Sequence, residues 1–204
     1  MGFYHDCIVP HLVHLSMRSE RLRPYRARVA GAAEGRVLEI GIGAGANLPH
    51  YPTGVSEVIG LEPSSRLLAV ARRTRESAAC PATLFEGTAE AIPLDDASVD
   101  TVVTTWTLCT IPEAVLALRE MRRVLRPAGQ LLFVEHGRAP DGSVRRWQDR
   151  LNPVWRRISG GCQLNRPIRT LIEDGGFRIA QIETAYADGP KPMAFFYEGR
   201  AVPA

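Results

Sequence analysis

The sequence has no long apolar run and few cysteines. No stretch approaches the roughly 18 consecutive apolar residues that a membrane-spanning helix requires. The first sixteen residues carry an aspartate and three histidines in place of an apolar core, so a secretory signal is not indicated. The four cysteines form no C-x-x-C pair and lie far apart along the chain, which indicates neither a disulfide framework nor a metal or arsenic site. We therefore predict a cytoplasmic protein with reduced thiols and no bound metal.

The sequence also lacks internal repeats, low-complexity tracts and a strong excess of one charge. Its formal net charge of +3 is too small to indicate a nucleic-acid partner. A length of 204 residues and a hydrophobic content of 45% allow one α/β domain with a full core. Nothing in the pattern indicates an oligomeric state.

The chain is organised around residues 36–47, which read R-V-L-E-I-G-I-G-A-G-A-N. The apolar first half is typical of a buried strand, and this strand ends in Gly41, Gly43 and Gly45. Glycine permits sharp turns with positive φ and leaves the backbone open to a ligand. The same residues fit the dinucleotide-binding pattern G-x-G-x-x-A, so the glycines alone leave the choice of nucleoside cofactor open.

Strands and helices alternate along most of the chain. We predict strands at residues 36–40, 57–61, 83–86, 100–105, 130–134, 177–186 and 193–199. We predict helices at residues 64–77, 113–126 and 165–175, and a leading helical cap within residues 1–33. The alternation predicts an α/β fold, a doubly wound, Rossmann-like sheet of seven mainly parallel strands over residues 34–204. The last two strands have no helix between them and predict an antiparallel terminal hairpin.

Residues 137–164 form a long insertion between a strand and the next predicted helix. Such insertions often build substrate pockets. Pro153 predicts a kink or two short helices here. Five arginines against one aspartate give the segment's polar face a charge of +4. The apolar stripe has two interpretations, a lid over the substrate, which we favour, or an element that lies on an anionic membrane surface. The stripe consists of Val144, Trp147, Leu151, Trp155 and Ile158.

Several motifs in a fixed order decide between the nucleoside cofactors. E-x-G-x-G-x-G at residues 39–45 is followed by G-T-A-E-A-I-P at 87–93, by L-R-P-A-G at 125–129 and by the terminal strand pair. From Gly35 to the C-terminus the chain thereby resembles the class I S-adenosylmethionine-dependent methyltransferases. The rival interpretation from another enzyme class is an NAD-dependent oxidoreductase, and a third is a cofactor-binding module without turnover.

Shorter motifs point to a group within that family. The chain is most similar to the alkyl thiol methyltransferases of the methyltransferase-like group, and less closely to the ubiquinone and menaquinone biosynthesis methyltransferases. The motifs are Gly45-Ala46-Asn47 with Tyr51-Pro52, Leu108-Cys109, Glu135-His136, Pro153-x-Trp155 and Gly161-Cys162-x-Leu164-x-Arg166.

The resemblance implies the cofactor contacts. The glycines would pass the methionine portion of S-adenosylmethionine, Glu62 would accept the ribose hydroxyls, and residues 87–89 would border the adenine. Many relatives carry Asp at the position of Thr88, so a carboxylate contact to the adenine amino group is replaced or missing here. The predicted cofactor residues are Glu39, Gly41, Gly43, Gly45, Asn47, Glu62, Pro63, Gly87, Thr88, Ala89 and Thr105.

The acceptor side is predicted from residues that follow the fourth and fifth strands. His136 is the candidate base that takes the acceptor's proton, and the alternative is a histidine that only hydrogen-bonds the lid. Cys109 could border the substrate or only pack, and Arg166 could hold an anionic group or pair with Glu173. The predicted substrate contacts are Trp106, Cys109, Trp147, Trp155 and Arg166.

Methyl transfer from a sulfonium needs alignment and exclusion of water more than acid–base machinery. We therefore expect a methyltransferase for a small apolar acceptor, with a thiol or sulfide as first choice. The alternatives are a phospholipid N-methyltransferase, which would make a peripheral membrane contact and associate the protein with membranes, and a quinone-type C-methyltransferase.

Overall fold

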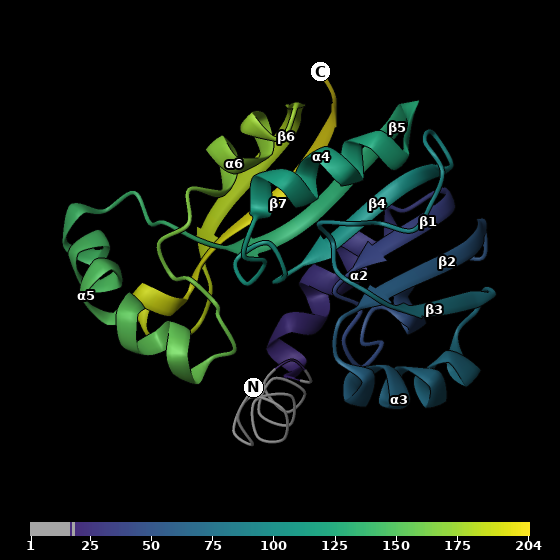
Figure 1. The fold of residues 1–204 in the computed structure, drawn as a ribbon. Coiled ribbons are helices and arrows are strands. Elements are labelled where there is room, and N and C mark those ends of the chain that lie inside the picture. Colours follow the sequence, from purple (N-terminus) through teal and green to yellow (C-terminus); the bar gives the residue numbers. More distant parts are fainter. Residues whose placement is uncertain (1–16, 18) are drawn as a thin grey trace.

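The computed structural model describes Met17 and residues 19–204, which form one seven-stranded mixed sheet with helices on both faces (Figure 1). The strand order is β3-β2-β1-β4-β5-β7-β6. The first part of the predicted helical cap, residues 1–16, lies outside the described residues. The strands are β1 (Gly35–Ile40), β2 (Val55–Glu62), β3 (Ala82–Glu86), β4 (Val99–Thr105), β5 (Leu125–His136), β6 (Phe177–Tyr186) and β7 (Phe195–Pro203).

The first five strands are parallel, and β7 inserts antiparallel between β5 and β6. The predicted doubly wound sheet and terminal hairpin are thus confirmed. Most element boundaries differ from the prediction by one to five residues, and two of these differences have a local cause. β5 begins at Leu125 because this residue already pairs with Val99, before the register shifts and regular pairing with β4 begins. β7 begins at Phe195 because Lys191–Met193 form a 3-10 turn, η5.

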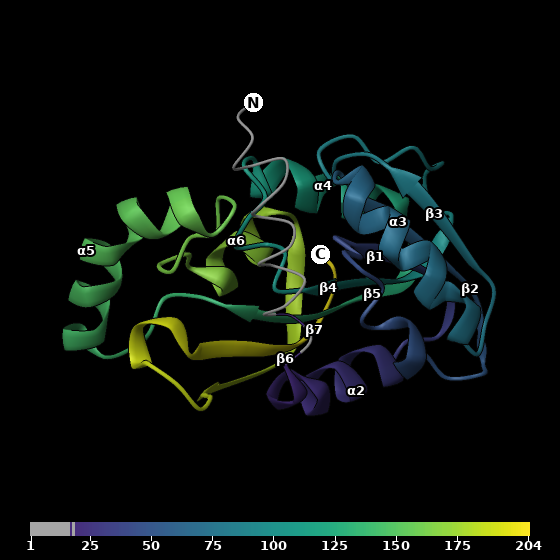
Figure 2. The ribbon, with the colours of Figure 1, turned by 90° about the horizontal axis from the view of Figure 1, so that it is seen from below.

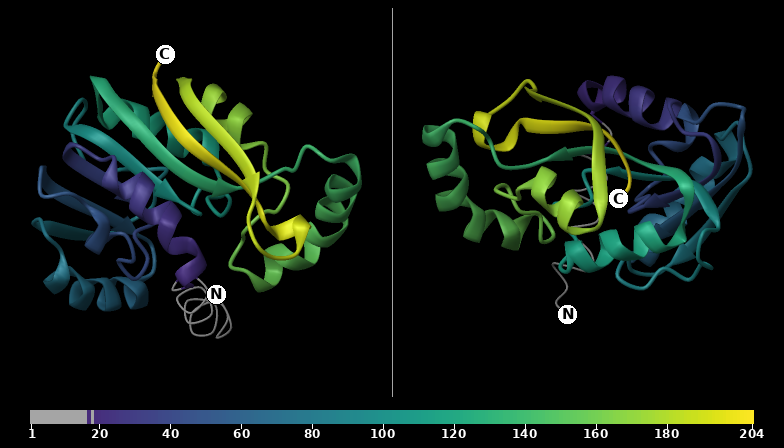
Figure 3. Two further views of the ribbon diagram at one scale, coloured as in Figure 1. Left: turned by 180° about the vertical axis from the view of Figure 1, so that it is seen from behind. Right: turned by 90° about the horizontal axis from the view of Figure 1, so that it is seen from above.

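Helices α2 and α3 cover one face of the sheet and α4 and α6 the other (Figures 2 and 3). The α-helices are α2 (Arg23–Gly31), α3 (Ser65–Thr74), α4 (Ala114–Val124), α5 (Gly142–Ile158) and α6 (Ile168–Asp174). Short 3-10 turns are η2 (Glu20–Leu22), η3 (Leu48–His50) and η4 (Arg75–Ser77). Ser64 caps the start of α3, and its hydroxyl accepts the Leu67 N–H, as the sequence predicts.

Successive side chains of a strand point to opposite faces of the sheet, so most of the buried residues form one core cluster on each face. In β1, Leu38 belongs to the cluster under α4 and α6, whereas its neighbour Val37 belongs to the cluster under α2 and α3. Leu131 and Leu132 of β5 divide in the same way. Because both faces are covered, the ends of the strands are the part of the sheet left for a ligand.

Helix α5 extends beyond the β6–β7 edge instead of lying over the glycine loop (Figures 1 and 2). It continues as one helix past Pro153, and it bends along its length. Its inner face carries the buried residues Val144 and Gln148, and the Gln148 amide bonds backbone groups of residues 137, 139 and 192. No helix among the described residues is long and apolar enough to cross a bilayer.

Candidate active site

The glycine loop after β1 turns tightly against β2 and β4. The N–H groups of Gly41 and Ile42 both donate to the Leu61 carbonyl oxygen, at 2.8 and 3.2 Å. Gly41 has a φ of +67°, and a Cβ added there would lie 2.5 Å from the side chain of Thr107. Glycine at 41 is therefore required by both conformation and space. The contact also places the loop after β4 directly beside the glycine loop.

Glu62, at the end of β2, fixes the middle of the glycine loop. Its two carboxylate oxygens accept the N–H groups of Gly43 and Ser64, each at 3.0 Å. Burial raises the pKa of Glu62, although both hydrogen bonds oppose this. Each oxygen keeps a further lone pair, so the carboxylate can still accept two ligand hydroxyls. The predicted ribose role therefore fits this geometry.

Glu39 lies at the centre of a buried polar network under the loop. Asn47 Nδ2 and the Tyr51 hydroxyl donate to its two oxygens, each at 2.8 Å. Burial raises the pKa of Glu39 to about 7, against the opposing effects of Tyr51 and Arg26. A cation brought to this network would favour the ionised carboxylate.

Arg26 of α2 completes the network, and the sequence prediction missed it. Its Nη1 donates to Asn47 Oδ1 at 2.8 Å and to Thr105 Oγ1 at 3.3 Å. Its guanidinium also lies 4.9 Å from the centre of the Trp106 ring. One arginine within an arginine-rich helix gives no local signal of such a role.

The loop after β3 brings the remaining predicted cofactor residues to the same sheet edge. Gly87 N–H donates to the Glu62 carbonyl at 3.2 Å, which ties this loop to the end of β2. Ala89 is buried, whereas Thr88 and Pro63 are exposed at the surface. The three loops after β1, β2 and β3 therefore meet at one edge, as the predicted cofactor site requires.

Trp106, the residue after β4, has a strained conformation. Its φ is +51°, in the left-handed region that large side chains avoid. The indole N–H is buried and has no hydrogen-bond partner among the described residues. A strained residue with an unpaired buried donor beside the glycine loop is a good candidate for a ligand contact.

Two cysteines and a histidine that lie far apart in the sequence meet beyond the ends of β4 and β5. Cys109 Sγ and Cys162 Sγ are 3.6 Å apart, and His136 Nε2 is 3.5 Å from Cys162 Sγ. The donor atoms of all three residues lie within 4.8 Å of one another. The sequence interpretation that these cysteines form no cluster, drawn from their spacing, was wrong for this pair. We call these three residues the thiol–imidazole cluster.

Backbone contacts hold the thiol–imidazole cluster together. Gln163 N–H donates to the Cys109 carbonyl at 2.9 Å, and Arg166 Nη1 donates to the Leu108 carbonyl at 2.6 Å. The buried Glu135 carboxylate accepts the Thr107 N–H at 3.0 Å. The alternative in which Arg166 pairs with Glu173 is not observed, since Glu173 pairs with Arg169.

The pKa values of the three residues in the cluster are shifted in different directions. The hydrogen bond between Cys162 and Cys109 and the contact with His136 lower the pKa of Cys162 despite its burial. The same contact with Cys162, together with burial, raises the pKa of Cys109. Burial alone would lower the pKa of His136, but Cys162 and Glu135 raise it on balance. Cys162 is therefore the thiol most easily deprotonated in this group.

The two tryptophans of α5 have different surroundings. Trp155 lies half-buried, and its indole N–H helps to lower the pKa of Cys162 without reaching hydrogen-bond geometry. Trp147 is 55% exposed, and the Arg150 guanidinium lies 5.9 Å from its ring centre. Val154 and Ile158 are exposed on the same helix. The prediction that Trp147 and Ile158 close a substrate pocket is therefore not supported by this structure.

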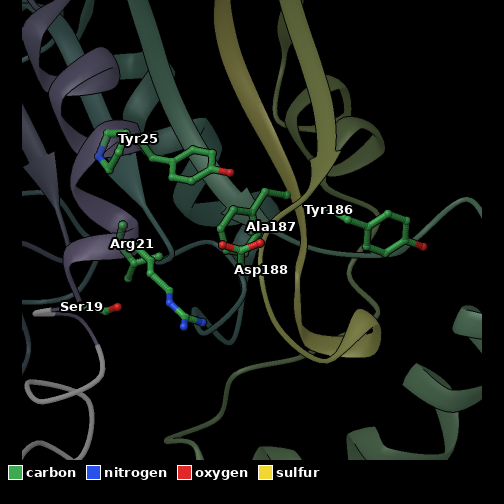
Figure 4. A pocket seen from close by; sticks show the side chains of 9 residues that line it. Ser19, Arg21, Tyr25, Tyr186, Ala187 and Asp188 are labelled. Atoms are coloured by element: carbon green, nitrogen blue, oxygen red, sulfur yellow. The ribbon is translucent and has the colours of Figure 1, made fainter.

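A pocket of about 620 Å³ lies between α2 and the turn that joins β6 to β7. Figure 4 shows Arg21 and Tyr25 on one side and Ala187 and Asp188 on the other. None of the predicted cofactor residues lines it. Tyr25 and Phe196 do, and both rings make edge contacts with Trp106. The pocket is therefore lined by two rings that pack against Trp106, and it does not include the glycine loop.

Comparison with known proteins gives a consistent picture. A family model for a methyltransferase domain matches residues 38–133. Human thiol S-methyltransferase TMT1B is 35% identical over 157 residues, which are 74% of this chain and 64% of the relative. Phosphatidylethanolamine N-methyltransferase of Cereibacter sphaeroides is 35% identical over 120 residues, covering 58% of this chain and 59% of the relative. The chain thus spans only about three fifths of the length of these relatives.

A solved structure extends the likeness to the whole fold. An S-adenosylmethionine-dependent methyltransferase of Thermotoga maritima, described as a possible histamine N-methyltransferase, has a TM-score of 0.68 at 22% identity. The match covers 97% of this chain and 99% of that one. At this identity the likeness concerns the fold alone.

Proposed function

The chain belongs to the class I S-adenosylmethionine-dependent methyltransferases, and we propose that it transfers the methyl group to the sulfur of a small apolar thiol or to sulfide. The observation that carries the proposal is the thiol–imidazole cluster, whose Cys109 follows two residues after Thr107, the residue next to Gly41 of the glycine loop. Human TMT1B, named a thiol S-methyltransferase, supports this choice of acceptor.

The residues of the loop fit the family's cofactor. The position where Gly43 would carry a Cβ has its nearest atom 3.9 Å away, so a ligand can approach the backbone there. We propose that Glu62 holds the ribose, that Gly41, Gly43 and Gly45 border the methionine portion, and that residues 87–89 border the adenine. The buried Glu39, with Asn47 and Thr105, would orient the charged end of the cofactor.

When bound, S-adenosylmethionine supplies an electrophilic methyl group. The protein's task is to align the acceptor sulfur, exclude water and present that sulfur as a thiolate. In place of His136 acting alone as a base, we assign activation of the acceptor to the whole thiol–imidazole cluster. Trp106 and Trp155 would border the acceptor, and Arg166 would position the loop that carries Cys109.

The test is a methylation panel read by mass spectrometry. Purified protein and S-adenosylmethionine are incubated with alkyl thiols, sulfide, phosphatidylethanolamine vesicles and a quinol. We expect thioethers from the alkyl thiols and methanethiol from sulfide. A product from the lipid or the quinol alone would reject the proposed acceptor, and calorimetry showing that NAD binds while S-adenosylmethionine does not would reject the cofactor.

A second candidate, phospholipid N-methylation, is favoured by one face of α5. Trp147, Val154 and Ile158 are exposed there among arginines, a combination suited to an anionic lipid surface. The Cereibacter relative carries the name of such an enzyme. Sedimentation with anionic and with neutral vesicles separates the two candidates, because only the lipid enzyme needs α5 to bind the anionic surface.

A further inference from the structure

We propose that Cys109, His136 and Cys162 bind a thiophilic divalent metal ion, with zinc the best fit, and that this ion binds the sulfur of the methyl acceptor. The metal site stands on the geometry of the cluster alone. The second part, coordination of the acceptor, rests on the proposed function.

The spacing of the donor atoms fits tetrahedral coordination. Zinc lies about 2.3 Å from cysteine sulfur and about 2.0–2.1 Å from histidine nitrogen, which places ligand atoms roughly 3.4–3.8 Å apart. The distances of 3.6 Å between the two sulfurs and 3.5 Å from Cys162 Sγ to His136 Nε2 match these values. Because all donor atoms lie within 4.8 Å, the remaining pair needs to close by roughly 1 Å to complete the site.

The charges around the cluster also suit a divalent cation. Two thiolates and the neighbouring Glu135 carboxylate would carry three negative charges, and the metal with Arg166 would balance them. Glu135 is fully buried, and its Oε2 has no hydrogen-bond partner among the described residues. A buried carboxylate with one unpaired oxygen is costly, and a cation bound nearby would reduce that cost.

The number of protein ligands indicates an open coordination position. Structural zinc sites usually have four protein ligands, whereas catalytic sites have three and leave the fourth position for water or substrate. Cys109 and His136 are buried, but Cys162 is only partly covered. We infer that the free position faces the side of Cys162 and that a small acceptor thiol would approach the ion there.

Coordination would activate the acceptor, because a thiol bound to such an ion is deprotonated. The acceptor sulfur exchanges its proton for a bond to the metal, and the proton passes to water. The sulfur then forms its bond to the methyl carbon as the methyl–sulfonium bond breaks. The products are a thioether and S-adenosylhomocysteine, and no oxidant or reductant is consumed.

Metal binding is tested directly on reduced, metal-stripped protein without substrate. Cobalt(II) serves as the spectroscopic probe and zinc as its competitor. We expect one equivalent of cobalt with a thiolate-to-cobalt charge-transfer band, displaced by one equivalent of zinc. No such band, or a Cys109–Cys162 disulfide that persists under reducing conditions in the purified protein, would overturn the site.

Matched variants locate the ligands. Cys109→Ser, Cys162→Ser and His136→Asn should each weaken cobalt binding at least about 100-fold, beyond the 10–100-fold effect of residues outside the ligand set. Cys80→Ser, which changes a buried cysteine outside the cluster, should leave it unchanged. Unchanged S-adenosylmethionine affinity confirms that each variant is folded. Full cobalt affinity in folded Cys162→Ser protein would reject the assignment.

Coordination of the acceptor sulfur by the metal ion is tested separately. Adding a small alkyl thiol to the cobalt-loaded protein should change the cobalt absorption spectrum, and an unchanged spectrum would reject coordination of the acceptor. Equal thioether formation by metal-free and zinc-loaded protein would also reject it. If cobalt binds at the cluster but no acceptor thiol is ever methylated, the metal site stands and the proposed function fails.

Discussion

The two sides of the candidate site are built in different ways. On the proposed cofactor side, the groups expected to face the ligand are mainly backbone and a few acids within short motifs after β1, β2 and β3. On the acceptor side, Cys109, His136 and Cys162 come from three separate segments, and Cys109 and Cys162 are 53 residues apart in the chain. A cofactor site of this kind can be predicted from contiguous sequence, whereas the residues of the proposed acceptor site come together only after folding.

The division predicts that the two sides can be damaged independently. His136→Ala should lower turnover by at least about 100-fold, the range for loss of a group that activates the acceptor, with cofactor affinity unchanged. His50→Ala, on η3, is the control and should remain active. Steady-state kinetics with calorimetry measure both quantities. A parallel loss of S-adenosylmethionine binding in His136→Ala would show that the two sides of the site are not independent.

The glycine loop should tolerate no side chain at its first position. Gly41→Ala places a Cβ against Thr107 at a φ of +67°, so the free energy of unfolding should fall by about 2 kcal/mol or more. Gly54→Ala is a matched control, because no atom lies within 4 Å of its Cβ position, and it should change stability by less than about 1 kcal/mol. Thermal and urea unfolding give both values, and equal effects would remove the steric argument.

Glu62→Ala should weaken S-adenosylmethionine binding by about 1–3 kcal/mol, because the ribose loses charge-assisted hydrogen bonds. Glu57→Ala, at the other end of β2, pairs with Arg36 and should leave the affinity unchanged. Calorimetric titration measures both. An unaltered affinity in Glu62→Ala would remove this residue from the cofactor side.

Cofactor binding should depend on the ionisation of Glu39. Its pKa is raised to about 7 in the free protein, so the carboxyl is largely protonated below pH 7. A cationic ligand favours the ionised form, and affinity should therefore rise by at most about tenfold per pH unit up to pH 7 and level off above it. Titrations in buffers of different ionisation enthalpy should show proton release below pH 7, and Glu39→Gln should abolish it.

The smallest effect is expected on α5. Trp147→Ala should change the free energy of unfolding by no more than about 0.5 kcal/mol and leave thiol methylation intact, because the ring is exposed. Trp155→Ala removes a half-buried ring beside Cys162 and should cost about 1 kcal/mol or more. Equal losses in the two variants would restore the interpretation of α5 as a lid that uses both tryptophans.

The fold was predictable because its signals are local. Strand periodicity, the Ser64 cap and the lack of a helix between the last two strands predicted the sheet and its hairpin. Element ends were less predictable, since the start of β5 at Leu125 depends on its pairing with Val99. The position of α5 beyond the β6–β7 edge was not predictable, because an amphipathic pattern does not say which neighbour a helix packs against.

The sequence by itself determined the family, the order of the elements and the loop from Gly41 to Gly45, because each depends on neighbours in the chain. Only the tertiary structure brought Arg26 to the Glu39 network and Cys109, His136 and Cys162 to one place. The physical reason is that parallel strands bring their carboxyl ends to one edge of the sheet, where residues distant in the chain become neighbours. The spacing of these residues along the sequence does not indicate that they are neighbours in the fold.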